Sequence, residues 1–400
     1  MRKLFYFNKP LSAETIEAIL KRSPVIYWLC NIRLREGLLF QKPCWEFIDK
    51  GNEIIVRQHQ CAAENEVPRE ILGRDISIRS ERFIEADLVH YPSGACAFIV
   101  SWNHILLDAK GTTLLFEHLN AVSENKEQDH ALFFPGPEKK TNIITYIRNM
   151  YKVKHFVQQS AKPPVYSVGE KKKKSEEGLT AEKIIAFSSE ETKIIIANAR
   201  KAGSRFGPTL YLIACCSQII DRLRRLKKRS GDLWIPVPYD GRLKGANGPL
   251  ISNTVSFLFY RIPAQELTSV PATVKYLGAQ MMEQIKLRIP QRYTMFLNMM
   301  RHVPLWLYYF LVSKTGKGVF ASYLYTSTGD NFNNLRSLFG EPIRDISMIP
   351  ALTFPPGLTF VFLKHDDQLS VNIAYSPDSV NPDELDFIEA QIKQLLITEH

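Results

Sequence analysis

The sequence has few cysteines, no membrane-length hydrophobic run and no hydrolase or nucleotide-binding motif. Six cysteines in 400 residues are too sparse for a disulfide framework, and none of them forms a CxxC pair. No His/Cys/carboxylate cluster has metal-ligand spacing. The longest apolar run, residues 303–312, would cover about half of a bilayer. A GxSxG elbow is absent, and Lys314–Gly318 lacks the upstream glycine and the terminal Ser/Thr of a P-loop. We therefore expect no metal site and no nucleophilic serine.

The composition is that of an ordinary globular protein with a basic surface. Of the 400 residues, 45% are hydrophobic and 23% charged, and the formal net charge is +10. The length favours two or three domains or two coupled lobes. The densest basic run, residues 222–229, either attracts phosphates or forms a solvated helix end. No aromatic residues accompany this run, so nucleic acid is not an expected partner.

The N-terminus does not predict a signal peptide. Lys9, Pro10 and Glu14 occur before a hydrophobic region of signal-peptide length can form. We therefore expect a cytoplasmic protein. The apolar run 303–312 is either a core helix or a shallow patch in peripheral contact with a membrane.

The clearest break in the chain lies at residues 158–178. It contains Pro163–Pro164 and the charge run Lys171–Lys174, which are typical of an exposed linker. We predict an N-terminal lobe at 1–160, a linker at 161–179 and a C-terminal lobe at 180–400. Helices and strands are intermixed in both lobes, so the fold class is α/β or α+β.

Residue patterns predict where the main elements lie. In the first half, the predicted helices are 13–21 and 109–122, and the strands are 83–90 and 95–102. In the second half, the predicted helices open at Ser188 and near Pro208 and cover 272–287, 291–312 and 382–397; the strands are 233–237, 255–262, 320–326, 358–363 and 369–375.

One segment carries a plausible catalytic group. A buried strand ending at Trp102 leads into His104, then Asp108, Gly111 and an amphipathic helix. A histidine at the end of a strand is held rigidly, and imidazole exchanges a proton near neutral pH. HxxxD alone is weak evidence, because a histidine in a strand–helix turn is often only structural.

An HxxxD motif after a strand resembles the HxxxDG signature of the chloramphenicol-acetyltransferase-like superfamily, which includes condensation domains and wax ester synthases. Further segments resemble that superfamily in the same order: residues 234–242, 251–257, 320–329 and 356–375. The resemblance covers roughly residues 80–398. It implies two chloramphenicol-acetyltransferase-like lobes, each a mixed sheet covered by helices, with a cleft or tunnel between them.

The motif departs from the superfamily pattern at two positions. Asn103 replaces the first histidine of HHxxxDG, and Ala109 occupies the position of the glycine after the aspartate. We expect Gly111 to take over part of that turn. The DFGWG motif of plant-type acyltransferases is absent, which argues against that branch.

The resemblance implies an acyltransferase that moves an acyl group from a thioester to an alcohol or amine. His104 would be the general base, and Asp108 would pair with an arginine, expected to be Arg242, to hold the catalytic loop. Asn253 and Ser327 are the candidate substrate-binding residues.

The expected co-substrate is a coenzyme A or phosphopantetheine thioester, supplied as acyl-CoA or by an acyl carrier protein, with no tightly bound cofactor. Condensation or cyclisation on a carrier protein is a second enzymatic possibility. The alternative from another class is a non-catalytic binding or scaffold protein that retained the fold, which Asn103 and Ala109 would suggest.

Overall fold

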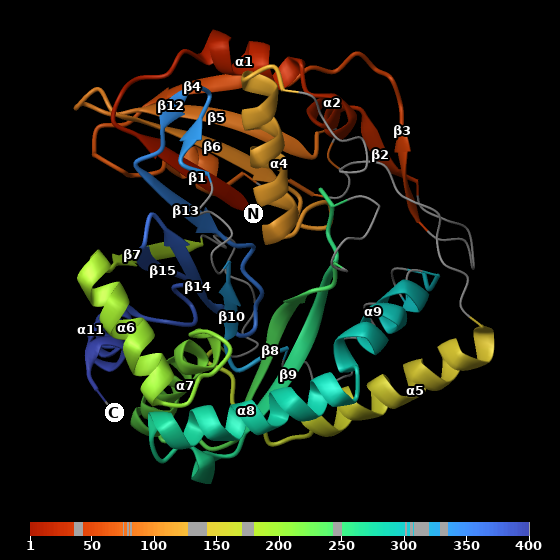
Figure 1. Ribbon diagram of the computed structural model, residues 1–400, viewed down its shortest axis with the longest axis vertical. Coiled ribbons are helices and arrows are strands. Elements are labelled where there is room, and N and C mark those ends of the chain that lie inside the picture. Colours follow the sequence, from red (N-terminus) through yellow and green to blue (C-terminus); the bar gives the residue numbers. More distant parts are fainter. Residues whose placement is uncertain are drawn as a thin grey trace.

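A computed structural model gives the structure of the chain. It describes residues 1–399 apart from 36–42, 75, 78–79, 81, 127–141, 170–179, 243–249, 301, 305–306, 308–319 and 329–334. The lysine run 171–174 and most of the apolar run 303–312 therefore lie outside the described residues. The described part divides into two lobes, one above the other in Figure 1.

The upper lobe is built on a five-stranded sheet with the order β13-β1-β6-β5-β4. Its strands are β1 (Arg2–Phe7), β4 (Val56–Gln60), β5 (Ile84–His90), β6 (Cys96–Trp102) and β13 (Asp345–Ile349). All neighbours are antiparallel except β4 and β5, which are parallel. Every residue of β6 is buried, as expected for a central strand covered on both faces.

Helices cover one face of this sheet. They are α1 (Ala13–Lys21), α2 (Pro24–Cys30) and α4 (Ala109–Ser123), and their apolar residues share one core with the sheet (Figure 1). Short elements complete the lobe: β2 (Ile32–Arg35), β3 (Cys44–Phe47), α3 (Arg69–Leu72), β11 (Ser337–Leu338) and β12 (Glu341–Pro342). Helix α4 follows β6 directly, so the chain turns at His104 between two rigid elements.

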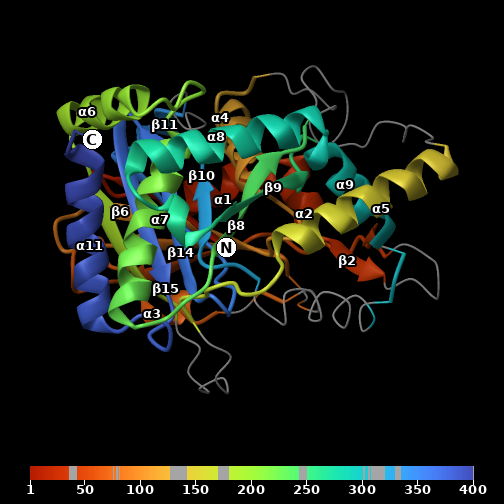
Figure 2. The same ribbon diagram turned by 90° about the horizontal axis from the view of Figure 1, so that it is seen from below.

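The lower lobe contains a four-stranded mixed sheet with the order β10-β14-β15-β7. Its strands are β7 (Ala181–Ala186), β10 (Leu324–Ser327), β14 (Leu358–His365) and β15 (Gln368–Tyr375), and only β10 and β14 are parallel. The helices that pack against it are α6 (Ser189–Lys201), α7 (Thr209–Leu226) and α11 (Pro382–Ile397) (Figure 2). Ser188 and Glu191 form the capping box that begins α6.

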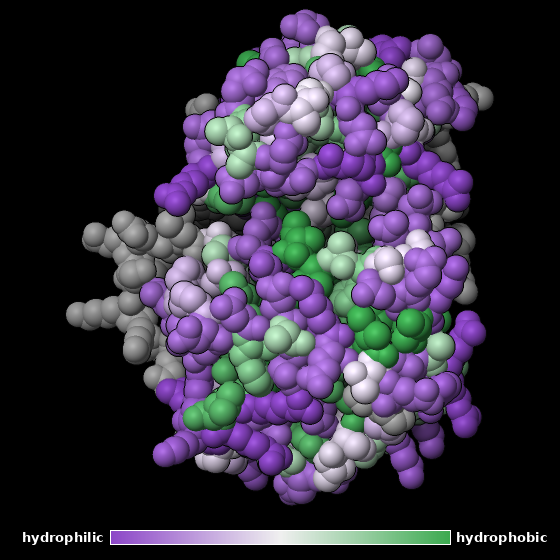
Figure 3. All heavy atoms as spheres, turned by 90° about the vertical axis from the view of Figure 1, so that its left-hand side faces the viewer, coloured by the Kyte–Doolittle hydropathy of each residue, from purple (hydrophilic) through white to green (hydrophobic). Residues whose placement is uncertain are grey.

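A long hairpin extends from the lower lobe towards the upper one (Figure 1). It consists of β8 (Leu233–Asp240) and β9 (Val255–Ile262), and α5 (Ile143–Ser160), α8 (Val270–Lys286) and α9 (Ile289–Met300) pack beside it. Seen from the side of α6 and α11, the surface is mostly hydrophilic, and hydrophobic side chains gather in an indentation between the lobes (Figure 3).

The mixed α/β class and the two helix-covered sheets agree with the prediction, but several of the strands and helices were not predicted from the sequence. Strand β1 lies between β6 and β13, and neither β1 nor β13 was expected. The predicted helix 291–312 is described as a helix only to Met300. The division at residues 160 and 180 stays a prediction: β13, from the second half of the chain, belongs to the upper sheet, and α5 packs on α9 and β9.

Candidate functional site

The candidate site begins at the carboxyl end of β6. The His104 Nδ1 lies 3.0 Å from the Leu107 carbonyl oxygen, which also accepts a 2.9 Å hydrogen bond from the Trp102 indole. A carbonyl only accepts, so Nδ1 carries the hydrogen and Nε2 keeps its lone pair in the neutral ring. The loop thus selects the tautomer in which Nε2 can act as a base.

The surroundings of His104 favour its neutral form. The residue is exposed to solvent, while protein atoms surround the ring closely enough for burial to lower its pKa below the ordinary 6.5. The hydrogen bond to the Leu107 carbonyl opposes part of this shift. A poorly solvated and neutral imidazole is suited to accept a proton at neutral pH.

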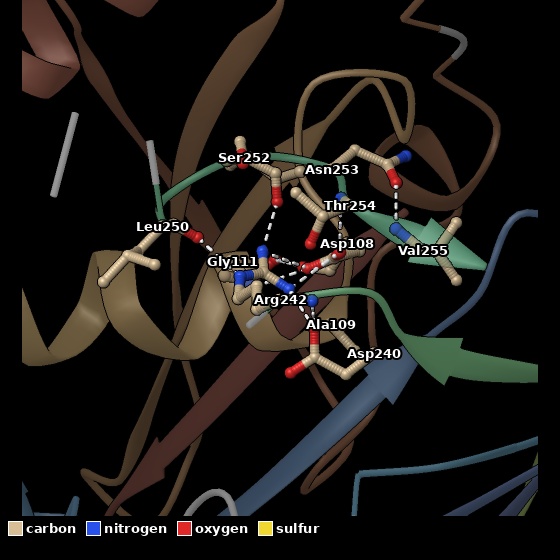
Figure 4. Close-up of polar contacts among 12 residues, drawn as sticks. Asp108, Ala109, Gly111, Asp240, Arg242, Leu250, Ser252, Asn253, Thr254 and Val255 are labelled. Carbon is tan, nitrogen blue, oxygen red and sulfur yellow. Dashed lines mark hydrogen bonds and ion pairs between the residues drawn. The ribbon is translucent and has the colours of Figure 1, made fainter. Parts of the chain in front are cut away.

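Asp108 begins helix α4 and links it to the lower lobe. Its carboxylate accepts hydrogen bonds from the Gly111 amide at 2.6 Å and the Thr254 amide at 2.8 Å. It also forms a bidentate ion pair with Arg242, with N–O distances of 2.9 and 3.0 Å (Figure 4). Asp108 is therefore at once the N-cap of α4 and the ion-pair partner of Arg242, the arginine that the resemblance implies.

All five N–H groups of the Arg242 guanidinium have acceptors. Besides Asp108, they are donated to the carbonyls of Leu250 and Ser252 and to the Asp240 carboxylate (Figure 4). The side chains of Asp108 and Arg242 are each only 8% exposed. A planar, fully satisfied guanidinium fixes the hairpin ends relative to α4 more rigidly than a lysine could.

Gly111 matters for packing rather than for the turn. It lies in the first turn of α4, and a Cβ there would come within 2.3 Å of the Ser252 carbonyl oxygen. The expectation that Gly111 replaces the missing glycine of the turn is therefore wrong. Ala109 is the first residue of α4 and has ordinary helical backbone, so this chain needs no glycine there.

Asn103 shapes the loop instead of facing the base. Its Nδ2 donates to the Ile76 carbonyl at 2.6 Å, and its Oδ1 accepts from the Ile105 amide at 3.0 Å. This second bond closes a local side-chain turn around His104. An asparagine at this position is compatible with an ordered His104.

Asn253 contacts the backbone of the His104 loop. Its Nδ2 donates to the His104 carbonyl at 2.7 Å, and its Oδ1 accepts from the Val255 amide at 3.2 Å. Sequence reasoning named this residue for substrate contact and missed the backbone contact, which joins positions 149 residues apart. Ser327 lies on another element, at the end of β10, and its contact with substrate stays a prediction.

Trp102 is the residue near His104 that sequence reasoning did not assign. Its side chain is almost fully buried, and its indole donates to the same carbonyl as His104 Nδ1. Its place as the last residue of the strand before the motif was the only available signal.

Other candidate features lie away from this constellation. Two small surface pockets are lined by residues near α1, α2, β4 and β5, and neither includes His104. A channel that reaches His104 stays a prediction. The described residues contain no group of three or more His, Cys, Asp or Glu side chains that could hold a metal ion.

Three of the six basic residues in the run at the end of α7 form ion pairs. Arg224 and Arg225 contact Asp221, and Lys227 contacts Glu384 on α11. The pairing favours a structural helix end over a phosphate site. In the part of the chain that the structure describes, no helix is both long and apolar enough to cross a bilayer.

Comparisons with solved structures establish the fold. The first condensation domain of the CDA synthetase superposes with a TM-score of 0.68 at 13% identity, over 100% of this chain and 91% of that one. The chain has the condensation-domain fold. No family model matches the sequence, and no curated protein matches it.

Two further structures with the condensation-domain fold show its range. The condensation domain of the monacolin K polyketide synthase MokA gives a TM-score of 0.65 at 11% identity, over 99% of this chain and 91% of that one. TRI101 of F. sporotrichioides, complexed with coenzyme A and T-2, gives a TM-score of 0.64 at 12% identity, over 97% of this chain and 92% of that one. Condensation domains of two synthases and a protein crystallised with coenzyme A thus share this architecture.

Proposed function

We propose that this protein is an acyltransferase that moves an acyl group from a thioester to an alcohol or amine. The observation that carries the proposal is His104, an exposed residue whose ring is held by Leu107 through Nδ1 and keeps a basic Nε2. The condensation-domain fold and the TRI101 complex with coenzyme A support a thioester donor.

In the proposed reaction, His104 Nε2 removes the proton from the acceptor O–H or N–H as that atom attacks the thioester carbonyl carbon. The new C–O or C–N bond forms, and collapse of the tetrahedral intermediate breaks the C–S bond. The imidazolium then returns its proton to the departing thiolate, so the enzyme ends unchanged. Proton transfer of this kind contributes about 10²–10⁴ in rate, and alignment of the two substrates supplies much of the rest.

The neighbouring residues have positioning roles in this proposal. Asp108 and Arg242 hold the start of α4 against the hairpin ends, and Asn253 holds the His104 carbonyl. We assign Ser327 to the substrate-binding region on the strength of the resemblance alone. Either acyl-CoA or an acyl carrier protein would deliver the donor, and the cytoplasm is the compartment we propose.

The test is thiol release from a panel of acyl-CoA donors, from acetyl to palmitoyl, in the presence of small alcohols or amines. The His104→Ala variant is expected to lose about 10²–10⁴ of the rate while keeping its fold. The same acyl group is also presented on a phosphopantetheinylated carrier protein. Turnover with this donor but not with acyl-CoA would show that the enzyme depends on a carrier protein. Equal rates for a folded His104→Ala variant and the wild type would refute the proposed base. Binding of acyl-CoA without turnover in the wild type would favour a binding protein.

A further inference from the structure

Helix α5 has two apolar faces, and only one of them is packed. Val153, Phe156 and Val157 point inwards and share a core with Phe259 and Ile289. These positions recur at three- and four-residue spacing, which is typical of the buried face of an amphipathic helix. The opposite face would be expected to be polar throughout.

That outer face instead carries an exposed apolar row. Ile144, Ile147 and Tyr151 follow at three- and four-residue intervals, so they lie on successive turns of one face. They are 73%, 52% and 69% exposed. We call these three residues the α5 stripe. Single exposed apolar residues are common, but three in one row mark an interaction surface.

Positive charge lies on both sides of the α5 stripe. At 100° per residue, Arg148 and Lys152 lie on one flank and Lys154 on the other, and all three are exposed. The helix contains no aspartate or glutamate, and these three cations pair with no carboxylate in the described part of the chain. The surface therefore complements something that is both apolar and negatively charged.

The position of α5 favours a flat partner over a concave one. Figures 1 and 2 show the helix along the outer edge of the molecule, with its N-terminal end extending away from the two sheets. One protruding helix presents a convex ridge and can approach an extended surface without obstruction by the described elements. Helices with an apolar face bordered by lysine and arginine bind in this way at the headgroup level of a bilayer.

We propose that the α5 stripe docks on a lipid bilayer that contains anionic headgroups. Ile144, Ile147 and Tyr151 would enter the interface, and Arg148, Lys152 and Lys154 would contact the headgroups. This surface is distinct from the apolar run 303–312, and the proposal does not depend on the acyl-transfer activity.

The test is flotation of the full chain with two kinds of vesicle, pure phosphatidylcholine and phosphatidylcholine with 30% phosphatidylserine. The wild type is expected to float with the anionic vesicles at low salt and to dissociate as salt rises. Replacing Ile144, Ile147 and Tyr151 by Asn is expected to reduce binding at least tenfold. Replacing Arg148, Lys152 and Lys154 by Gln is expected to reduce it about fivefold for each cation removed.

Matched controls use exposed residues elsewhere, with thermal unfolding to verify the fold of each variant. The apolar control changes Ile55, Ile194 and Phe206 to Asn, and the charge control changes Lys193, Arg200 and Lys275 to Gln. Both controls are expected to bind like the wild type. Equal binding to both vesicle types, no binding to either, or equal loss in the controls would overturn the proposal. A concentration-dependent dimer that the α5 variants abolish, without vesicle binding, would assign the stripe to a second copy of this chain.

Discussion

Removal of the Asp108 carboxylate tests the link between the two lobes. In the Asp108→Ala variant, the Gly111 and Thr254 amides and the Arg242 guanidinium lose their acceptor together. Arg242 would keep the Asp240 carboxylate, which is 48% exposed and therefore a weak partner for a buried charge. The substitution thus leaves an uncompensated cation between α4 and the hairpin.

The expected loss is large because both partners are buried. Breaking a buried ion pair by removing one partner costs about 3–5 kcal/mol of unfolding free energy. Loss of the N-cap of α4 contributes about 1 kcal/mol within that range. The matched control is Glu46→Ala. Arg33 also donates two hydrogen bonds to Glu46, at 2.9 and 3.0 Å, but these side chains are 60% and 36% exposed. That change should cost less than about 1 kcal/mol.

Urea denaturation followed by tryptophan fluorescence measures both losses. Adding Arg242→Met to Asp108→Ala should recover part of the stability, because the double variant no longer buries an unpaired charge. If Asp108→Ala cost no more than Glu46→Ala, the pair would not carry the link between α4 and the hairpin. Additive losses in the double variant would lead to the same conclusion.

Three further predictions concern the His104 loop. Because burial lowers the pKa of His104 below 6.5, kcat/KM should be level near pH 7. It should fall tenfold per pH unit once the pH drops below that pKa. A pH–rate profile in which kcat/KM already falls at a pH above 6.5 would contradict the described environment of the ring. Gly111→Ala should lower the unfolding free energy by about 1–3 kcal/mol in urea denaturation, since its Cβ would meet the Ser252 carbonyl, whereas Gly203→Ala, with open space around it, should show only the strain of its positive φ. Asn253→Ala should lower kcat by about 10- to 100-fold in the thiol-release assay with little change in stability, and an unchanged kcat would remove its positioning role.

The sequence predicted the local structure around His104 well. Helix α4 begins directly after Asp108, because the Asp108 carboxylate caps the third residue of the helix, a contact within four residues. Strand β6 and helix α4 lie within one residue of their predicted limits. Hydrophobic periodicity and helix capping depend on residues within one or two turns of each other. Both can therefore be recognised in the sequence without knowing the rest of the fold.

Some strands were missed because their stability is not local. Strand β1 starts with Arg2 and Lys3, and Lys3 is fully buried although lysine usually indicates exposure. Its place depends on pairing with two strands that are distant in the chain. One is β6, and the other is β13, which lies about 340 residues further along. The residue pattern of β1 alone does not indicate which strands it pairs with.

By itself, the sequence determined the strand and the helix on either side of the candidate site, with a histidine on the turn between them and an aspartate at the helix start. The tertiary structure decided which distant groups meet there: Arg242 on Asp108, Asn253 on the His104 carbonyl, and the Ser252 carbonyl against Gly111. It also left the outer row of α5 bare. Local hydrogen bonds follow from neighbouring residues, whereas the burial that gives an ion pair or a glycine its importance exists only after distant segments have packed together.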